Sequence, residues 1–201
     1  MPFELFSTAV TRPDAVFCDA SFILDVLTYE VPTVAATITD LDAVKQVRAA
    51  EAASFFYNYS AAGTQFVSSP YTLQEVANTL GNHVLRNRKA GNNWANLKRT
   101  DHARFLALRA EALSIIEDAW TRFQAHDIWF VVPNDGDDTP QGKRISSELV
   151  ETAHLLLRMY AALDAMDAFH ISTGLACGLE WFVTTDAGWK DVAEINVFCD
   201  K

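Results

Sequence analysis

The chain has few cysteines among its 201 residues, and they are widely separated. Cys18, Cys177 and Cys199 form no Cys-x-x-Cys pair, which argues against a structural zinc site. Each lies in an apolar strand-like or helix-like stretch, where cysteine usually acts as a small hydrophobic residue. We therefore expect three buried thiols in a reducing compartment.

Membrane and export signals are also missing. No stretch approaches the roughly 18 uncharged apolar residues that a helix needs to cross a bilayer. The first residues, Met-Pro-Phe-Glu-Leu-Phe, lack the basic region followed by an apolar region that marks a signal peptide. We expect a cytoplasmic protein with no membrane association.

Positive charge is scarce, because 16 lysines and arginines face 26 acidic residues, for a net charge of −10. This balance argues against broad non-specific binding of nucleic acid, since contacts to phosphate need lysine and arginine. The exception is the segment 86–104, where six basic residues accompany the single acid Asp101. It is either a local RNA-binding surface or a solvated helix face and loop. The candidate RNA-binding residues are Arg86, Arg88, Lys89, Lys98 and Arg99.

Half of the residues are apolar, which suits one globular domain over 1–201. Short apolar runs alternate with amphipathic stretches, and this alternation predicts an α/β fold with a mainly parallel sheet of about five strands and helices on both faces. Residues 1–14 are expected as a lead-in. The expected strands are 15–18, 64–68, 128–132, 181–183 and 195–198.

The expected helices follow from apolar residues at three- and four-residue steps. The polar segment 81–96 is expected to hold a loop between helices, and 133–142 an acidic loop. The expected helical segments are 20–27, 41–59, one starting at 70, 101–124, 145–163 and one running from 164 to a stop at Gly178.

Four acids stand at comparable places in this pattern. Asp19 and Asp186 each follow a strand, Glu75 lies in the helix after the second strand, and Asp167 lies near the start of a later helix. Because parallel strands end at one edge of a sheet, these side chains are expected in one crevice. Two carboxylates about 5 Å apart repel by about 3 kcal/mol at an effective dielectric constant near 20, so such a group favours a bound cation. Oxygen ligands favour Mg²⁺ or Mn²⁺, which supports metal-assisted phosphodiester hydrolysis.

The acids also have a simpler interpretation, in which Asp19 and Asp186 are helix N-caps and Glu75 is a partner of the helix dipole. A cap is not expected at Asp167 if the helix starts at Asp164, and the four acids together favour one shared site over four separate roles. Asp164 lies one turn before Asp167 on nearly the same helix face and is the candidate for an additional or substitute metal ligand, with Asp167 preferred for its Asp-Ala-x-His context. His170 is interpreted mainly as a packed, hydrogen-bonded histidine, with substrate contact as the alternative.

At this point four motifs together resemble the PIN domain, a family that includes the VapC-type toxin ribonucleases. The motifs are Val16-Phe-Cys-Asp19-Ala-Ser21, Val67-Ser-Ser-Pro-Tyr-Thr-Leu-Gln-Glu75-Val, Asp167-Ala-Phe-His-Ile-Ser-Thr-Gly and Phe182-Val-Thr-Thr-Asp186-x-x-Trp189. The resemblance covers about 15–198 and implies a Rossmann-like three-layer α/β/α sandwich. It also implies an endoribonuclease that depends on Mg²⁺ or Mn²⁺.

The resemblance assigns roles to single residues. It implies that Asp19 and Asp186 bind the main ion, that Asp167 completes the shell, and that Glu75 holds or activates the attacking water. Ser21 and Thr184 would orient the carboxylates or a bound water. RNA is the implied substrate, and a cognate antitoxin and a homodimer are the implied partners.

The chain differs from the small toxin members of that family in its length, with helical elaborations expected around 38–62 and 81–125. Trp189 also stands where phenylalanine is more usual. The alternative function is a non-catalytic PIN-like binding or scaffold module. A phosphohydrolase with an aspartyl nucleophile is disfavoured, because Ser21 stands where a second aspartate would be needed.

Overall fold

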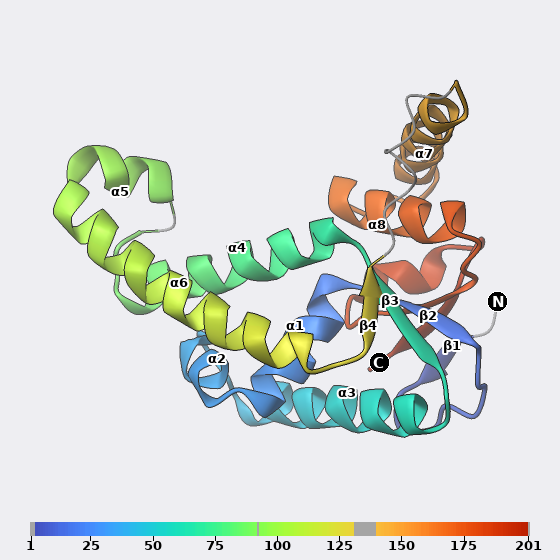
Figure 1. Cartoon of the computed structure of the whole chain (residues 1–201), viewed down its shortest axis with the longest axis horizontal. Coiled ribbons are helices and arrows are strands. Elements are labelled where there is room, and N and C mark those ends of the chain that lie inside the picture. The colour runs from blue at the N-terminus through green and yellow to red at the C-terminus, as the bar shows by residue number, and fades with distance from the viewer. Residues whose placement is uncertain (1–2, 92, 131–139, 201) are drawn as a thin grey trace.

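The computed structural model describes residues 3–91, 93–130 and 140–200, with the side chains of 129, 130 and 140–147 left aside. In this part of the chain a six-stranded, all-parallel sheet lies between two layers of helices (Figure 1). The prediction of a Rossmann-like α/β/α sandwich is confirmed. The strands are β1 (Phe3–Leu5), β2 (Ala15–Cys18), β3 (Gln65–Ser68), β4 (Ile128–Phe130), β5 (Trp181–Val183) and β6 (Asn196–Cys199).

The helices occupy most of the remaining described chain. Asp19, Asp42, Ser69, Asn93, Asp101 and Asp164 supply side-chain N-caps, as short polar residues commonly do. The helices are α1 (Ala20–Glu30), α2 (Pro32–Thr37), α3 (Ala43–Ala61), α4 (Pro70–Asn87), α5 (Trp94–Thr100), α6 (His102–Gln124), α7 (Pro140–Met159), α8 (Ala165–Ala176) and the short 3₁₀ helix η1 (Ala187–Asp191).

Two expected segments differ in extent from the structure. The lead-in 1–14 contains β1, an edge strand that pairs with β6 and brings the sheet to six strands. The expected connection between helices within 81–96 is present but short, because α4 continues to Asn87 and α5 begins at Trp94. Along this part of α4 Arg86 and Asn87 are exposed, while Leu80, Val84 and Leu85 are buried. The expected strand end at 131–132 and most of the expected loop 133–142 lie outside the described residues.

The strand order β1-β6-β5-β2-β3-β4 places a topological switch between β2 and β5. The chain moves outward from β2 through β3 to β4, then returns to the other side of β2 to form β5 and β6. Ligands of open α/β sheets bind outside the carboxyl ends of the strands at such a point. The residues after β2 and β5 therefore occupy the expected place for a site.

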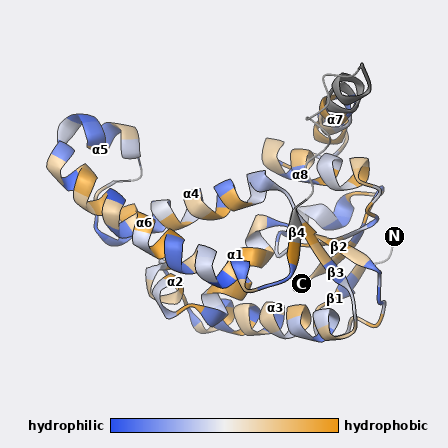
Figure 2. Cartoon of the chain, viewed as in Figure 1, coloured by the Kyte–Doolittle hydropathy of each residue, from blue (hydrophilic) through white to orange (hydrophobic). Residues whose placement is uncertain are grey.

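The sheet has a core on each face because successive strand side chains alternate. Val16 and Cys18 of β2 pack towards α1 and α3, whereas Phe17 packs towards α8 and η1. Figure 2 shows the apolar strands between helices whose outer faces are polar. α8 lies very close to the sheet, since a Cβ atom on Gly174 would lie 2.5 Å from the Phe182 ring.

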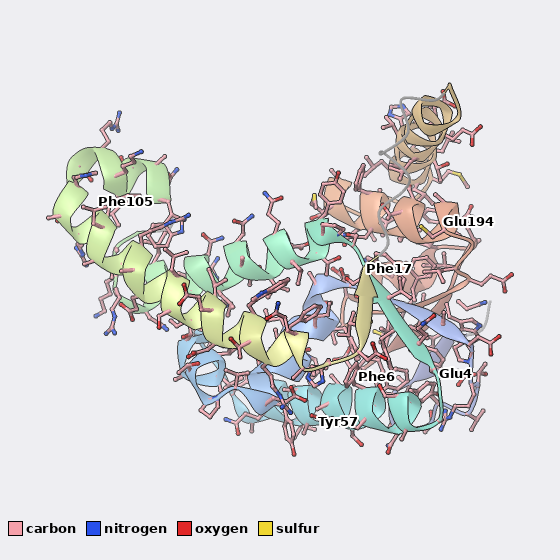
Figure 3. All side chains as sticks on the ribbon, viewed as in Figure 1. Glu4, Phe6, Phe17, Tyr57, Phe105 and Glu194 are labelled. Atoms are coloured by element: carbon pink, nitrogen blue, oxygen red, sulfur yellow. The ribbon has the colours of Figure 1, made fainter. Side chains whose placement is uncertain are left out.

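The outer half of α4, α5 and the first half of α6 extend away from the sheet (Figure 1). We call this part, residues 81–111, the arm. It has a small apolar cluster of its own, formed by Val84, Leu85, Leu97, Leu108 and Ala112. Figure 3 shows Phe105 in the arm at a distance from Phe17 in the sheet.

The cysteine prediction is correct for two residues and wrong for the third. Cys18 and Cys199 are buried, as expected. Cys177 is exposed, because it lies at the C-terminal end of α8 just before the turn at Gly178. Among the helices of the described chain, none has the length and apolar character needed to cross a membrane.

Candidate functional site

The site begins at Asp19, which follows β2 and caps α1. The residue is only 4% exposed, so its carboxylate is held by fixed neighbours rather than by solvent. Oδ2 accepts hydrogen bonds from Ser21 Oγ at 2.6 Å, Thr184 Oγ1 at 2.8 Å and the Ser21 backbone N–H at 3.3 Å. The described residues supply no hydrogen bond to Oδ1, which leaves that oxygen available to a ligand.

The two hydroxyl groups also connect the ends of β2 and β5. Ser21 Oγ accepts from the Thr185 N–H at 3.0 Å, and Thr184 Oγ1 accepts from the Asp186 N–H at 2.9 Å. Each hydroxyl thus donates to Asp19 and accepts from the backbone after β5. This arrangement holds the chain after β5 against Asp19, so Ser21 and Thr184 occupy the supporting position expected of them.

Glu75 and His170 meet beside Asp19. Glu75 is half-buried in α4, and its Oε2 lies 2.9 Å from Nε2 of His170, which comes from α8 and is 1% exposed. One ligand atom from each of Asp19, Glu75 and His170 lies within 4.8 Å of the other two. Because an ionised carboxylate only accepts hydrogen bonds, Nε2 carries a proton in this contact. The other ring nitrogen, Nδ1, is buried without a hydrogen-bond partner.

Asp167 lies one helical turn before His170 on the same side of α8. Its Oδ1 accepts from Trp189 Nε1 at 2.9 Å, and its Oδ2 accepts from the Asp164 N–H at 2.9 Å. Asp164 and Asp167 form a capping box, so Asp167 has a capping role that the sequence interpretation had discounted. The buried Trp189 indole fixes the direction of this carboxylate.

Asp164 and Asp186 lie at the margin of this group. The exposed Asp164 carboxylate accepts from the backbone N–H groups of Met166 and Asp167 as the N-cap of α8. The exposed Asp186 carboxylate accepts from the Gly188 N–H at 2.7 Å as the N-cap of η1. The close group of potential ligand atoms in the described chain contains Asp19, Glu75 and His170, without Asp164, Asp167 or Asp186. The ligand roles of these three aspartates stay predictions.

Burial, together with neighbouring carboxylates, raises the pKa of two acids of the site, Asp19 and Asp167. Burial raises the pKa of Asp19, hydrogen bonds from Ser21 and Thr184 and the His170 ring oppose this rise, and the Glu75 carboxylate adds to it. Burial also raises the pKa of Asp167 to about 6, against its hydrogen bonds from Asp164 and Trp189, and the charges of Asp164 and Asp19 contribute to the rise. Within the described chain, no lysine or arginine forms an ion pair with these acids. A cation bound among these acids would reduce the electrostatic repulsion between their carboxylates.

The donor set fits a hard divalent ion. Within the close group Asp19 Oδ1 and the Glu75 carboxylate are the oxygen donors, and oxygen donors suit Mg²⁺ and Mn²⁺. His170 adds an imidazole, a ligand more usual for zinc or iron, but its Nε2 is directed at Glu75. In that position it acts as a hydrogen-bond donor that orients Glu75.

Sequence reasoning undervalued two members of the site. His170 lies three residues after Asp167, so helical spacing placed it on the same face, but its contact with Glu75 joins residues 95 apart in sequence. Trp189 was noted only because it stands where phenylalanine is more usual, whereas its indole N–H donates to Asp167. The expected basic residues lie in the arm, away from this cluster (Figure 1).

Comparison with known proteins adds no relative to this description. No protein-family model matches the chain, and neither the curated proteins nor the solved structures contain a match. The assignment of a function therefore rests on the chemistry of the site.

Proposed function

We propose that the chain is a metal-dependent endoribonuclease that hydrolyses RNA phosphodiester bonds. The observation that carries this proposal is the group of Asp19, Glu75 and His170 at the switch point, with Asp167 beside it and its pKa raised to about 6. Such a concentration of acid without a lysine or arginine partner suits a bound divalent ion. The four motifs that resemble the PIN domain support the same activity.

In this proposal Asp19, Glu75 and Asp167 hold Mg²⁺ or Mn²⁺. The bound ion would polarise a phosphate oxygen and lower the pKa of a bound water. Ser21 and Thr184 keep Asp19 Oδ2 occupied, so Oδ1 is the oxygen that would bind the ion. His170 contacts and orients Glu75, which would in turn orient an attacking water.

The experiment is cleavage of a mixed RNA pool with Mn²⁺, with Mg²⁺ and with EDTA. We expect cleavage only with metal, and a loss of at least about 100-fold in Asp19→Asn, because even outer-shell changes at metal sites cost about 10- to 100-fold. Asp14→Asn is the matched control, since Asp14 is exposed and precedes the same strand at its amino end. Cleavage that survives EDTA, or that Asp14→Asn and Asp19→Asn reduce equally, would contradict the proposal.

The second candidate is a non-catalytic binding module. It is favoured by Asp186, whose exposed carboxylate caps η1 instead of joining the close group around Asp19. Folded protein that binds Mn²⁺ and RNA yet cuts nothing would support this candidate. The toxin role, the antitoxin and the homodimer stay predictions of the resemblance.

A further inference from the structure

We propose that the outer face of α4 and the basic arm form one continuous track that guides single-stranded RNA to the acidic site. This inference takes the kind of ligand from the proposed ribonuclease function.

The arm carries charge of the opposite sign to the rest of the chain. Residues 81–111 contain seven of the 16 basic residues and two of the 26 acidic residues. The arm therefore has a formal charge of +5, while the remainder of the chain has −15. A polyanion would be repelled by most of the molecule and attracted to the arm, and a basic element of this kind raises local concentration and steers association.

Some of the basic residues build the arm, and others are exposed without an acidic partner among the described residues, although Arg99 donates to Asn96 and Lys98 lies over the Phe105 ring. Arg88 pairs with Glu111 at 2.8 Å, and Arg104 donates to the Arg88 carbonyl at 2.7 Å, so these two arginines join α4 to α6. Within the described chain, the remaining candidates of the segment form no ion pair with an acid, and all are exposed. These candidates are Arg86, Lys89, Lys98 and Arg99.

One face of α4 leads from the site to the arm. Residues 11 apart in an α-helix are three turns apart and differ by about 20° in direction, so Glu75 and Arg86 lie on the same face. Asn78 and Asn82 lie between them, and Tyr71 lies one turn before Glu75. The face thus runs from an exposed aromatic ring through an acid and two amides to a cation.

The side chains along this path suit a single strand better than a duplex. Tyr71 is 39% exposed and offers a ring for base stacking. In the arm an open hollow of about 490 Å³ is lined by Asn93, Ala95, Asn96 and Arg99, which offer amide and guanidinium groups to bases and phosphates. The exposed His102 ring stacks on Phe105 nearby. Unpaired bases present the faces and edges that such groups contact.

The arm is held at a defined position relative to α4. Trp94 at the start of α5 packs over the buried Gly81 of α4, where its Nε1 would lie 3.4 Å from an added Cβ. Trp94 also contacts the Phe105 ring of α6 at 6.1 Å between centroids. This packing therefore fixes the distance between the basic residues of the arm and the acidic site. Along α4 the step from Glu75 to Arg86 is about 17 Å, or about five stacked nucleotides.

The test measures binding of fluorescent oligo(U) of 20 nucleotides in EDTA, where cleavage does not interfere. We expect Lys98→Gln/Arg99→Gln to reduce the slope of log affinity against log salt by about 1.4, because each of the two lost contacts to a single strand contributes about 0.7. At 0.1 M salt this corresponds to an affinity about 25-fold lower than that of the wild type. The control is Arg12→Gln/Lys45→Gln, which also removes one arginine and one lysine but from outside the arm, and which should keep nearly the wild-type slope.

Two further arms of the experiment address strand and length. For the wild type, affinity is expected to rise steeply from oligo(U) of four nucleotides, which covers only part of the path from the site to the arm, to 12 nucleotides, which cover the whole path. An arm variant that binds like the control would overturn the proposal, as would RNA duplex binding as tightly as the single strand. Metal-dependent cleavage together with equal RNA binding by the arm variant and the wild type would refute the proposed track but not the ribonuclease function. Weaker RNA binding by the arm variant, with no cleavage by the wild type, would refute the ribonuclease function but not the track.

Discussion

At the scale of single residues, the capping and ligand interpretations of an aspartate do not exclude each other. Asp19 caps α1 through Oδ2, and the same oxygen accepts from Ser21 and Thr184. Oδ1 is left for a ligand because the network uses only one side of the carboxylate. A short acid directly after a strand serves both purposes, which explains why a cap at this position is compatible with a metal site.

Asp167 provides the residue-scale prediction. Its pKa of about 6 in the folded chain lies above the ordinary 3.8, so the folded state keeps a proton that the unfolded state releases. The metal-free protein should therefore lose stability as pH rises from about 4 to above 6, by on the order of 1 to 3 kcal/mol. In Asp167→Asn the part of this loss that Asp167 causes should disappear, so the slope should be shallower than in the wild type, while the contribution of Asp19, whose pKa is also raised, remains. Urea unfolding in EDTA between pH 4.5 and 8 measures it.

The slope, and not the absolute stability, decides this test. An asparagine can still accept from Trp189 but cannot accept at both positions, so the variant carries a cost that is the same at every pH. Asp14→Asn, exposed and far from α8 in sequence, should keep the wild-type slope. Equal slopes in the wild type and Asp167→Asn would mean that another group causes the pH dependence.

At the scale of elements, the close approach of α8 to the sheet sets the position of His170 and Asp167. Gly174 lies one turn after His170, and an alanine there would bring Cβ to 2.5 Å from Phe182 and 3.3 Å from Phe17. We expect Gly174→Ala to lower the free energy of unfolding by about 1–3 kcal/mol through overpacking. For a chain of this size the melting temperature should fall by about 2–4 °C per kcal/mol.

A second helix glycine gives the matched control for Gly174. At Gly81 an added Cβ would meet Trp94 at 3.4 Å, which is ordinary van der Waals contact. Gly81→Ala should therefore be neutral or stabilise the protein by up to about 1 kcal/mol, because alanine favours helix more than glycine. Thermal unfolding of both variants checks the pair. Equal losses in the two would show that the space beside Gly174 is not what matters.

The elements differ in how well the sequence predicts them. β2, β3 and β5 follow from short apolar runs that end at polar residues, because a strand buried on both faces needs such a run. β1 has three residues with Glu4 at its centre, and only pairing with the distant β6 makes it a strand. The contact of Glu75 with His170 likewise depends on how α4 and α8 lie in the tertiary structure. No local pattern distinguishes Asp186 as a cap from Asp186 as a ligand, because both need a short acid after β5.

At the scale of the whole molecule, the acidic site and the basic arm lie at the two ends of one helix. The N-terminal part of α4 carries Glu75 beside the switch point, and its C-terminal part enters the arm (Figure 1). In the proposal binding and chemistry are thereby separated: the arm would attract phosphate, while the acids would hold a cation. A chain of net charge −10 can offer such a basic region because seven of its 16 basic residues, with only two acids, lie in the arm.

The same separation predicts how a divalent ion affects the stability of the whole chain. An ion that binds the folded state alone stabilises it by about 2.7 kcal/mol at 100 times its dissociation constant. For a chain of this size that is about 5–10 °C in melting temperature. We expect Mn²⁺ to produce this rise in the wild type, in Asp14→Asn and in Lys98→Gln/Arg99→Gln, but not in Asp19→Asn. Differential scanning calorimetry with Mn²⁺ and with EDTA measures the effect. An equal rise in Asp19→Asn would mean that the ion binds the acidic surface in general, because a specific site cannot keep its affinity without the buried carboxylate.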